Sequence, residues 1–286
     1  MDNEVAGAIY SLVGLFMILI FIFGLVLYGF VILVFHSILR ESKTCTNLLI
    51  LSLSYCNLFH VFSYPLNIVS CFQRGWGYGR LGCEIDAFWV HWMAITSVAH
   101  LMMLAIDRYL SVKGRLSIKG PVYINLTVAF CWLYGLLWSS LPLTGWSSYE
   151  LEGMKISCSA KFGSNAALDI SYYIALFITD YTLPLVIIVL CYVGIYMHIR
   201  RHNALVFNGT TAVPGQDSAS SIERKLVNIV ILMVCSFTVA WTPYAVVCFI
   251  MMTRQGPLNP IATTIPAIIA KSSPCYFPIV YGLKHS

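Results

Sequence analysis

One basic residue stands in the middle of an apolar stretch. Lys271 is the only charged residue between residues 261 and 283, and it lies about ten residues from either end of that stretch. A lysine held in an apolar pocket can lose its proton and attack an aldehyde, which forms a Schiff base. The alternative is a lysine that forms a salt bridge with a neighbouring helix. The residues alone leave both possibilities open.

The composition places this lysine in a membrane protein. Of the 286 residues, 59% are apolar and 10% are charged, whereas a soluble domain has about 45–50% and about 25%. A disordered chain, a disulfide-dense secreted scaffold and a nucleic-acid binder each need more charge or more cysteine, so these classes are excluded. A charged side chain at the centre of a bilayer costs about 2.5–3.5 kcal/mol, which makes Lys271 a candidate functional residue.

The elements that must position Lys271 are membrane-spanning helices. The first apolar run, from Ala6 to Phe35, exceeds the roughly 20 residues that a span needs, and its acidic start and its length do not fit a cleaved signal peptide. Eleven Lys and Arg residues fall on one side and five on the other, so we expect the N-terminus outside and the C-terminus in the cytoplasm. The sequence therefore predicts an all-α, seven-transmembrane helix bundle in the cell membrane, as one domain over residues 1–286. The expected spans are approximately 8–36, 46–71, 82–113, 121–143, 167–198, 223–252 and 260–283.

Two of the ten cysteines lie outside the expected spans in a way that suggests a bond. Cys83 lies at the outer end of the third span and Cys158 in the long outer loop, in an oxidising compartment where a disulfide persists. We predict a disulfide between them that holds this loop across the mouth of the bundle, and the alternative is two unrelated thiols. No spacing of Cys and His indicates a metal site.

Several motifs taken together resemble those of the opsins, the retinal-binding members of the rhodopsin-like seven-helix receptors. The most specific is Ala270-Lys271-Ser272-Ser273, because in opsins this lysine carries retinal as a Schiff base. The resemblance covers the chain from the first span to the end and implies covalently bound retinal, in its 11-cis or all-trans form. The supporting motifs are Asp107-Arg108-Tyr109, Trp132, Pro184, Tyr192, Trp241-Thr242-Pro243-Tyr244, Pro278-Ile279-Val280-Tyr281, Gly145-Trp146-Ser147-Ser148-Tyr149 and Glu152-Gly153-Met154.

Two acids are placed to pair with such a Schiff base. A protonated Schiff base is a buried cation, and a low dielectric would discharge it unless an anion lay close by. The resemblance places Asp86 at the counterion position of vertebrate visual opsins, and Glu152 at the loop position used by many invertebrate and non-visual opsins. Both stay candidates, and the alternative for each is a solvated residue at the mouth of the bundle.

The resemblance also assigns residues to a retinal pocket. Trp241 and Tyr244 would present aromatic faces to the polyene. Asp180 and Tyr181 lie in the fifth span near the place of the retinal ring, and His91 resembles a pocket-facing position of the third. An ionised Asp180 would shift electron density along the polyene. We favour the alternative of a protonated acid that is hydrogen-bonded to a neighbour such as His91.

The resemblance further implies a switch near the cytoplasmic side. Isomerisation of the ligand would favour a different helix packing. Arg108 and Glu223 resemble the ionic pair that holds such receptors shut, and its release would expose a groove for a helix of a heterotrimeric G protein. The alternative for Glu223 is a solvated helix start. The implied switch residues are Asp107, Arg108, Tyr109, Glu223, Tyr192 and Tyr281.

Four positions depart from the family pattern. Gly29 stands where the first span usually has Asn, Asn57 where the second has Asp, Ala240 where Cys is usual, and Phe277 where the seventh span has Asn. Several of these positions normally contribute to a polar network of water and sodium. We therefore expect an unusually apolar coupling region.

These observations favour a light-sensing receptor over an enzyme. Its expected partners are a heterotrimeric G protein, the lipid bilayer and arrestin, without nucleic acid. Two other hypotheses stay open at this point. One is a retinal photoisomerase of the peropsin type, and the other is a receptor for a chemical ligand whose Lys271 is only salt-bridged.

Overall fold

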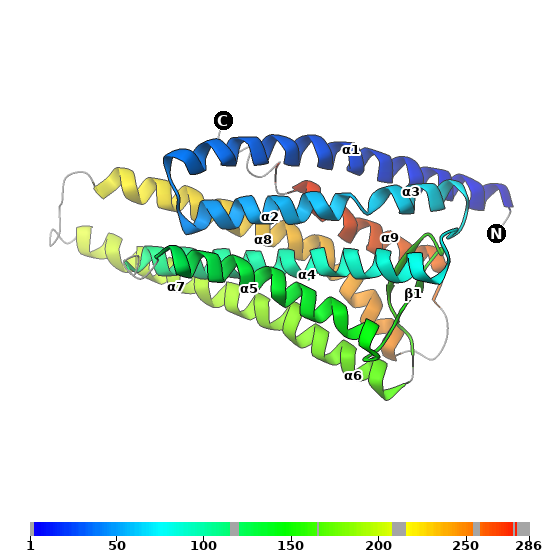
Figure 1. The fold of residues 1–286 in the computed structure, drawn as a ribbon. Helices are drawn as coiled ribbons and strands as arrows, with labels where there is room; N and C mark the ends of the chain where they lie inside the picture. Colours follow the sequence, from blue (N-terminus) through cyan, green and yellow to red (C-terminus); the bar gives the residue numbers. More distant parts are fainter. Residues whose placement is uncertain are drawn as a thin grey trace.

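The computed structural model describes residues 3–114, 120–164, 166–207, 216–253, 258–276 and 278; within these ranges the side chains of residues 3–5, 121, 202–207, 216–227 and 229 lie outside the description. Long helices run side by side as a bundle, and the N-terminus lies at the end that carries the strands (Figure 1). The helices are α1 (Asn3–Glu41), α2 (Cys45–Val61), α3 (Tyr64–Phe72), α4 (Gly79–Val112), α5 (Pro121–Ser140), α6 (Ala167–Leu176), α7 (Leu183–Phe207), α8 (Gln216–Thr253) and α9 (Pro260–Ser272). Shorter turns are η2 (Leu141–Thr144), η3 (Phe177–Thr182) and η4 (Ser273–Cys275).

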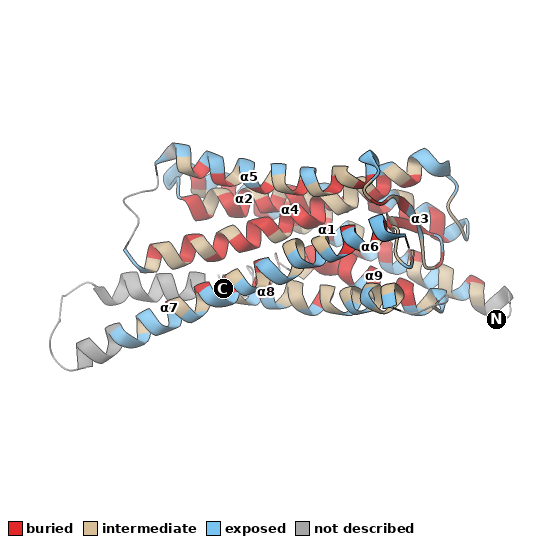
Figure 2. Cartoon of the chain, turned by 90° about the horizontal axis from the view of Figure 1, so that it is seen from below, coloured by how far each residue is buried: buried red, intermediate tan, exposed pale blue. Residues whose placement is uncertain are grey.

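Six helical segments are long and apolar enough to cross a bilayer within the described residues. The shorter α9, continued by η4, is a seventh helix of the bundle, so the predicted seven-helix fold is confirmed. Large apolar side chains such as Leu12, Leu33 and Val239 are exposed on the outside, where lipid rather than water is the compatible solvent. Buried residues run along α4 and α2, whereas exposed ones mark the outward faces of α5 and α7 (Figure 2).

The second span is broken by local chemistry. Pro65 occupies the first turn of α3, and proline has no amide hydrogen to continue the α-helical ladder. The Ser63 amide bonds instead to the His60 carbonyl at 3.1 Å, and the Phe59 carbonyl accepts the Trp89 indole N–H at 2.7 Å. The break separates α2 from α3 and sets which face α3 turns toward the bundle.

The fifth span contains a π-helical segment. η3 connects α6 to α7, and the Leu183 amide bonds to the Ile178 carbonyl five residues earlier. Pro184 follows and cannot donate in the α-helical pattern. Such π-segments often occur at functional sites. Here the segment places Asp180 and Tyr181 in the wall of a cavity.

A β-hairpin covers one end of the bundle, which we call the hairpin end. Strand β1 (Tyr149–Glu152) pairs antiparallel with β2 (Ser157–Ala160), with Glu152 opposite Ser157. The predicted disulfide between Cys83 and Cys158 is present and ties β2 to α4. Gly153 turns the chain with a φ of 52°, and a Cβ there would lie 2.2 Å from the Thr264 hydroxyl. Only glycine permits this approach of the hairpin to α9.

Candidate functional site

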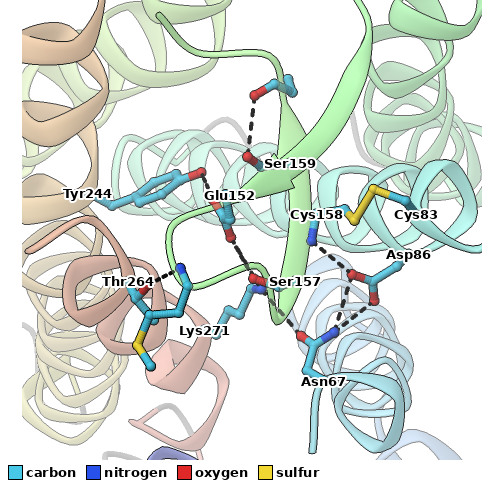
Figure 3. A network of polar contacts seen from close by, with 12 residues as sticks. Asn67, Cys83, Asp86, Glu152, Ser157, Cys158, Ser159, Tyr244, Thr264 and Lys271 are labelled. Atoms are coloured by element: carbon cyan, nitrogen blue, oxygen red, sulfur yellow. Dashed lines mark hydrogen bonds and ion pairs between the residues drawn. A yellow bond between two sulfur atoms is a disulfide. The ribbon is translucent and has the colours of Figure 1, made fainter. Parts of the chain in front are cut away.

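Lys271 is buried in the last turn of α9 and has two polar neighbours. Its Nζ lies 3.5 Å from Glu152 Oε1 and 3.3 Å from Asn67 Oδ1, and its side chain is 8% exposed. The Tyr64 hydroxyl donates to the Lys271 backbone carbonyl. Side chains of β1 and α3 therefore meet the lysine of α9 (Figure 3).

Glu152 is the acid in direct contact with the lysine. It ends β1 and its side chain is 13% exposed. Oε1 accepts a hydrogen bond from the Ser157 hydroxyl at 2.9 Å, and Oε2 accepts one from the Tyr244 hydroxyl at 3.0 Å. A buried ion pair offsets its desolvation cost only when further hydrogen bonds satisfy the remaining lone pairs. Ser157 and Tyr244 meet that requirement.

Asp86, the other predicted counterion, is separated from the lysine by the side chain of Asn67. The residue is 1% exposed, and its carboxylate accepts the Asn67 amide N–H at 3.2 and 3.3 Å. The Cys158 backbone N–H also reaches it, at 3.4 Å. Asn67 thus stands between Asp86 and Lys271 (Figure 3). Sequence reasoning missed Asn67, although an amide two residues after Pro65 in an apolar span was a usable signal.

An apolar cavity of about 270 Å³ opens beside the lysine. Aliphatic and aromatic side chains form most of its wall, and Lys271 and Glu152 are among its few polar lining residues. Apolar pockets with a few convergent polar groups are the usual form of ligand sites. All five predicted pocket residues line this cavity: His91, Asp180, Tyr181, Trp241 and Tyr244.

Two pocket aromatics are fixed by contacts with neighbouring elements. The Trp241 indole N–H donates to the Ser273 hydroxyl at 2.9 Å, two residues beyond the lysine. Its ring meets the Tyr244 ring edge-on, with centroids 6.1 Å apart. The Tyr181 hydroxyl bonds to Thr242 at 2.9 Å. These contacts tie η3 and η4 to α8 at the cavity.

Asp180 does not have the partner that we expected. One carboxylate oxygen accepts the Thr179 hydroxyl at 3.4 Å, and the other is buried without a partner in the described part of the chain. His91 instead packs edge-on against the rings of Tyr149 and Tyr172, and no hydrogen bond joins it to Asp180 among the described side chains. The neighbour that bonds to Asp180 is therefore Thr179, and His91, which we named as an example, packs against aromatic rings instead.

Comparison with known proteins decides the family. The family described as "7 transmembrane receptor (rhodopsin family)" matches residues 29–281. The chain belongs to this family. It is a multi-pass membrane protein, and the rhodopsin and melanopsin relatives support the resemblance to opsins that the motifs predicted.

Several rhodopsin-family relatives are similar over nearly the whole chain. Rhodopsin of Sepia officinalis is 30% identical over 99% of this chain and 63% of its own length. Melanopsin of Felis catus is 33% identical over 86% of this chain and 53% of its own length. The crystal structure of squid rhodopsin superposes with a TM-score of 0.90 at 27% identity, over 98% of this chain and 83% of that one. The chain therefore spans less than two thirds of the length of these two sequence relatives.

The predicted switch residues of this rhodopsin-family chain are described in part. Arg108 bonds to the Asp107 carboxylate at 2.7 Å and also to the Thr46 hydroxyl, which itself donates to Asp107 at 2.5 Å. The Lys113 ammonium lies 4.6 Å above the Tyr109 ring. The Tyr192 hydroxyl is buried without a partner among the described residues. The Glu223 side chain and Tyr281 lie outside the described residues, so the predicted Arg108–Glu223 pair does too.

The positions that depart from the family pattern have different surroundings. The Ser97 hydroxyl donates to Asn57 Oδ1 at 2.8 Å, whereas Asn57 Nδ2 is buried without a partner in the described residues. Gly29 faces open space, since no atom lies within 4 Å of a Cβ built there. Ala240 is buried, and Phe277 lies outside the described residues.

Proposed function

We propose that this protein is a light-activated receptor that holds retinal on Lys271 as a Schiff base and activates a heterotrimeric G protein. The observation that carries the proposal is a buried lysine, ion-paired to Glu152, in the wall of an apolar and aromatic cavity. Retinal supplies a polyene that absorbs light and changes shape by isomerisation. The family membership and the rhodopsin and melanopsin relatives support the same function.

The residues of the cavity fit such a ligand. Its wall is apolar apart from a few groups, and Trp241 and Tyr244 present aromatic surface to it. Lys271 is the only amine among the described residues that line the cavity. A single buried nucleophile beside an apolar space is what covalent capture of a long apolar aldehyde requires.

The charge arrangement supports Glu152 as the principal counterion. Its carboxylate lies 3.5 Å from Lys271 Nζ and is oriented by Ser157 and Tyr244. A fixed anion at this distance stabilises a positive charge on the lysine nitrogen. Asp86 makes no direct contact with that nitrogen among the contacts of the described residues, so its effect is weaker.

The contacts also suggest how a change in the cavity reaches the opposite end of the bundle. Trp241 lies in α8, two residues before Pro243, and is bonded to Ser273 in η4. A ligand that displaces Trp241 would shift α8 against η4. At the far end, Arg108 is held by Asp107 and Thr46, and its release would open the surface for the G protein and, later, arrestin.

Reconstitution with 11-cis-retinal tests the proposal. We expect a visible absorption band that is lost in Lys271→Ala and kept in Lys161→Ala, because Lys161 pairs with Asp169 outside the cavity. Illumination should then stimulate nucleotide exchange on a G protein. The absence of a band, or a band that survives Lys271→Ala, would contradict the proposal. The relatives are named rhodopsins and melanopsins, so they favour a receptor over the photoisomerase considered above.

A further inference from the structure

Asn67 connects the lysine to the second acid. Its Oδ1 accepts from Lys271 Nζ at 3.3 Å, and its Nδ2 donates to both Asp86 oxygens at 3.2 and 3.3 Å. We propose that Asn67 is a positioning residue that makes Asp86 part of the charge environment of the Lys271 nitrogen. The coupling to a retinal Schiff base rests on the proposed function. The coupling to the unmodified lysine does not depend on it.

The fold places Asn67 at this point through the break in the second span. α3 begins anew at Tyr64, with Pro65 in its first turn. Tyr64 and Asn67 are three residues apart and so lie on one helix face. The Tyr64 hydroxyl donates to the Lys271 carbonyl, and Asn67 reaches the lysine nitrogen. One face of α3 therefore holds the lysine at both its backbone and its side chain.

The orientation of the Asn67 amide follows from its two partners. A lysine ammonium only donates hydrogen bonds, and an ionised carboxylate only accepts them. The amide must therefore turn its oxygen toward Lys271 and its nitrogen toward Asp86. The negative end of the amide dipole, its oxygen, then faces the lysine cation, and the positive end, its NH₂ group, faces the Asp86 anion. Asn67 is 2% exposed, so bulk water does not screen the interaction of this dipole with the two charges.

The spacing lets two carboxylates serve one cation. Glu152 and Asp86 would repel each other strongly if both contacted the same nitrogen directly. Asn67 keeps Asp86 out of direct contact, while the aligned dipole of its amide still couples Asp86 to the nitrogen. Glu152 then acts directly and Asp86 acts through the amide. Removing Asn67 should uncouple Asp86 and leave Glu152 unaffected.

A double-mutant cycle on the retinal-loaded protein measures this coupling. The readout is the pH at which the visible band gives way to the near-ultraviolet band. With Asn67 present, Asp86→Asn should lower that pH by about one unit, a tenfold change in proton affinity. In an Asn67→Leu background the same substitution should shift it by less than about 0.3 unit. Glu152→Gln should have the same large effect in both backgrounds. Equal effects of Asp86→Asn in the two backgrounds would overturn the proposal.

A second readout needs no retinal. The rate of reductive methylation of Lys271, followed by mass spectrometry at fixed pH, reports how readily the nitrogen loses its proton. Asp86→Asn should raise this rate about tenfold with Asn67 present and less than about twofold in Asn67→Leu. If coupling appears here and no variant forms a visible band, the retinal proposal fails while the role of Asn67 stands. Additive effects in this cycle would overturn that role.

Two further variants separate coupling from general damage. Asn57 is also a buried asparagine of the second span, but it bonds to Ser97 and not to the lysine. In an Asn57→Leu background, Asp86→Asn should retain its full effect, and loss of the effect there would overturn the proposal. Asn67→Thr, a smaller polar substitution, repeats the cycle if Asn67→Leu does not fold, with the same expected loss of coupling.

Discussion

The Tyr244 hydroxyl donates a hydrogen bond of 3.0 Å to Glu152 Oε2. Tyr244 belongs to α8, and the same carboxylate contacts Lys271 of α9 through its other oxygen. Glu152, the proposed counterion, therefore joins the hairpin to α8 and α9. A change of charge on the lysine nitrogen would therefore act on α8 through a single side chain, that of Glu152.

The Tyr244 contact predicts a link between the counterion and the resting state. Tyr244→Phe removes a hydrogen bond to a charged group, which contributes about 1.5–3 kcal/mol. We expect the visible band to remain, because Lys271 and Ser157 still hold Glu152, and we expect nucleotide exchange in the dark to rise about tenfold. Tyr173→Phe is the matched control, since the Tyr173 hydroxyl is buried without a partner in the described part of the chain. Unchanged dark exchange in Tyr244→Phe would refute this link.

The two acids should differ in their effect on the pigment. A carboxylate near the lysine nitrogen favours the protonated, visible-absorbing form, so removing it lets the proton leave at lower pH. We expect Glu152→Gln to lower the pH at which the visible band disappears by about two units or more, and Asp86→Asn by about one. A pH titration of the absorption spectrum measures both shifts. The reverse order would make Asp86 the principal counterion.

The hairpin depends on the absence of a side chain at residue 153. Gly153→Ala adds a Cβ 2.2 Å from the Thr264 hydroxyl at a positive φ, and it should displace the Met154 amide from Thr264, to which it bonds at 2.9 Å. We expect a loss of about 1–3 kcal/mol in stability and faster loss of bound retinal. Gly29→Ala has open space instead and should be neutral or stabilising by up to about 1 kcal/mol. Thermal unfolding distinguishes the two, and equal effects would disprove the steric argument.

Sequence reasoning reached the seven-helix fold because the spans are long, apolar and nearly free of charge. It also reached Lys271, since a charge inside such a span stands out. The relation between Asp86, Asn67 and Lys271 could not be predicted, because it depends on the helix break at residues 62 and 63, which rotates α3 by an amount that no periodicity reports. The β-hairpin was likewise missed, since its strands are four residues each and gain their order from the disulfide and from contacts with α8 and α9.

Asp180 illustrates a different limit. The sequence showed an acid inside an apolar span, and the structure places it in the cavity wall as expected. Which neighbour bonds to it could not be predicted, because the packing of His91 against Tyr149 and Tyr172 is a tertiary feature. The type of a buried residue was therefore more predictable than its partner.

The bond between retinal and the protein can be located directly. The protein is reconstituted with 11-cis-retinal in the dark, reduced with borohydride, digested and analysed by mass spectrometry. We expect a retinyl adduct on the peptide that carries Lys271 and on no other lysine. An adduct confined to another lysine, or no adduct after a visible band has formed, would contradict it.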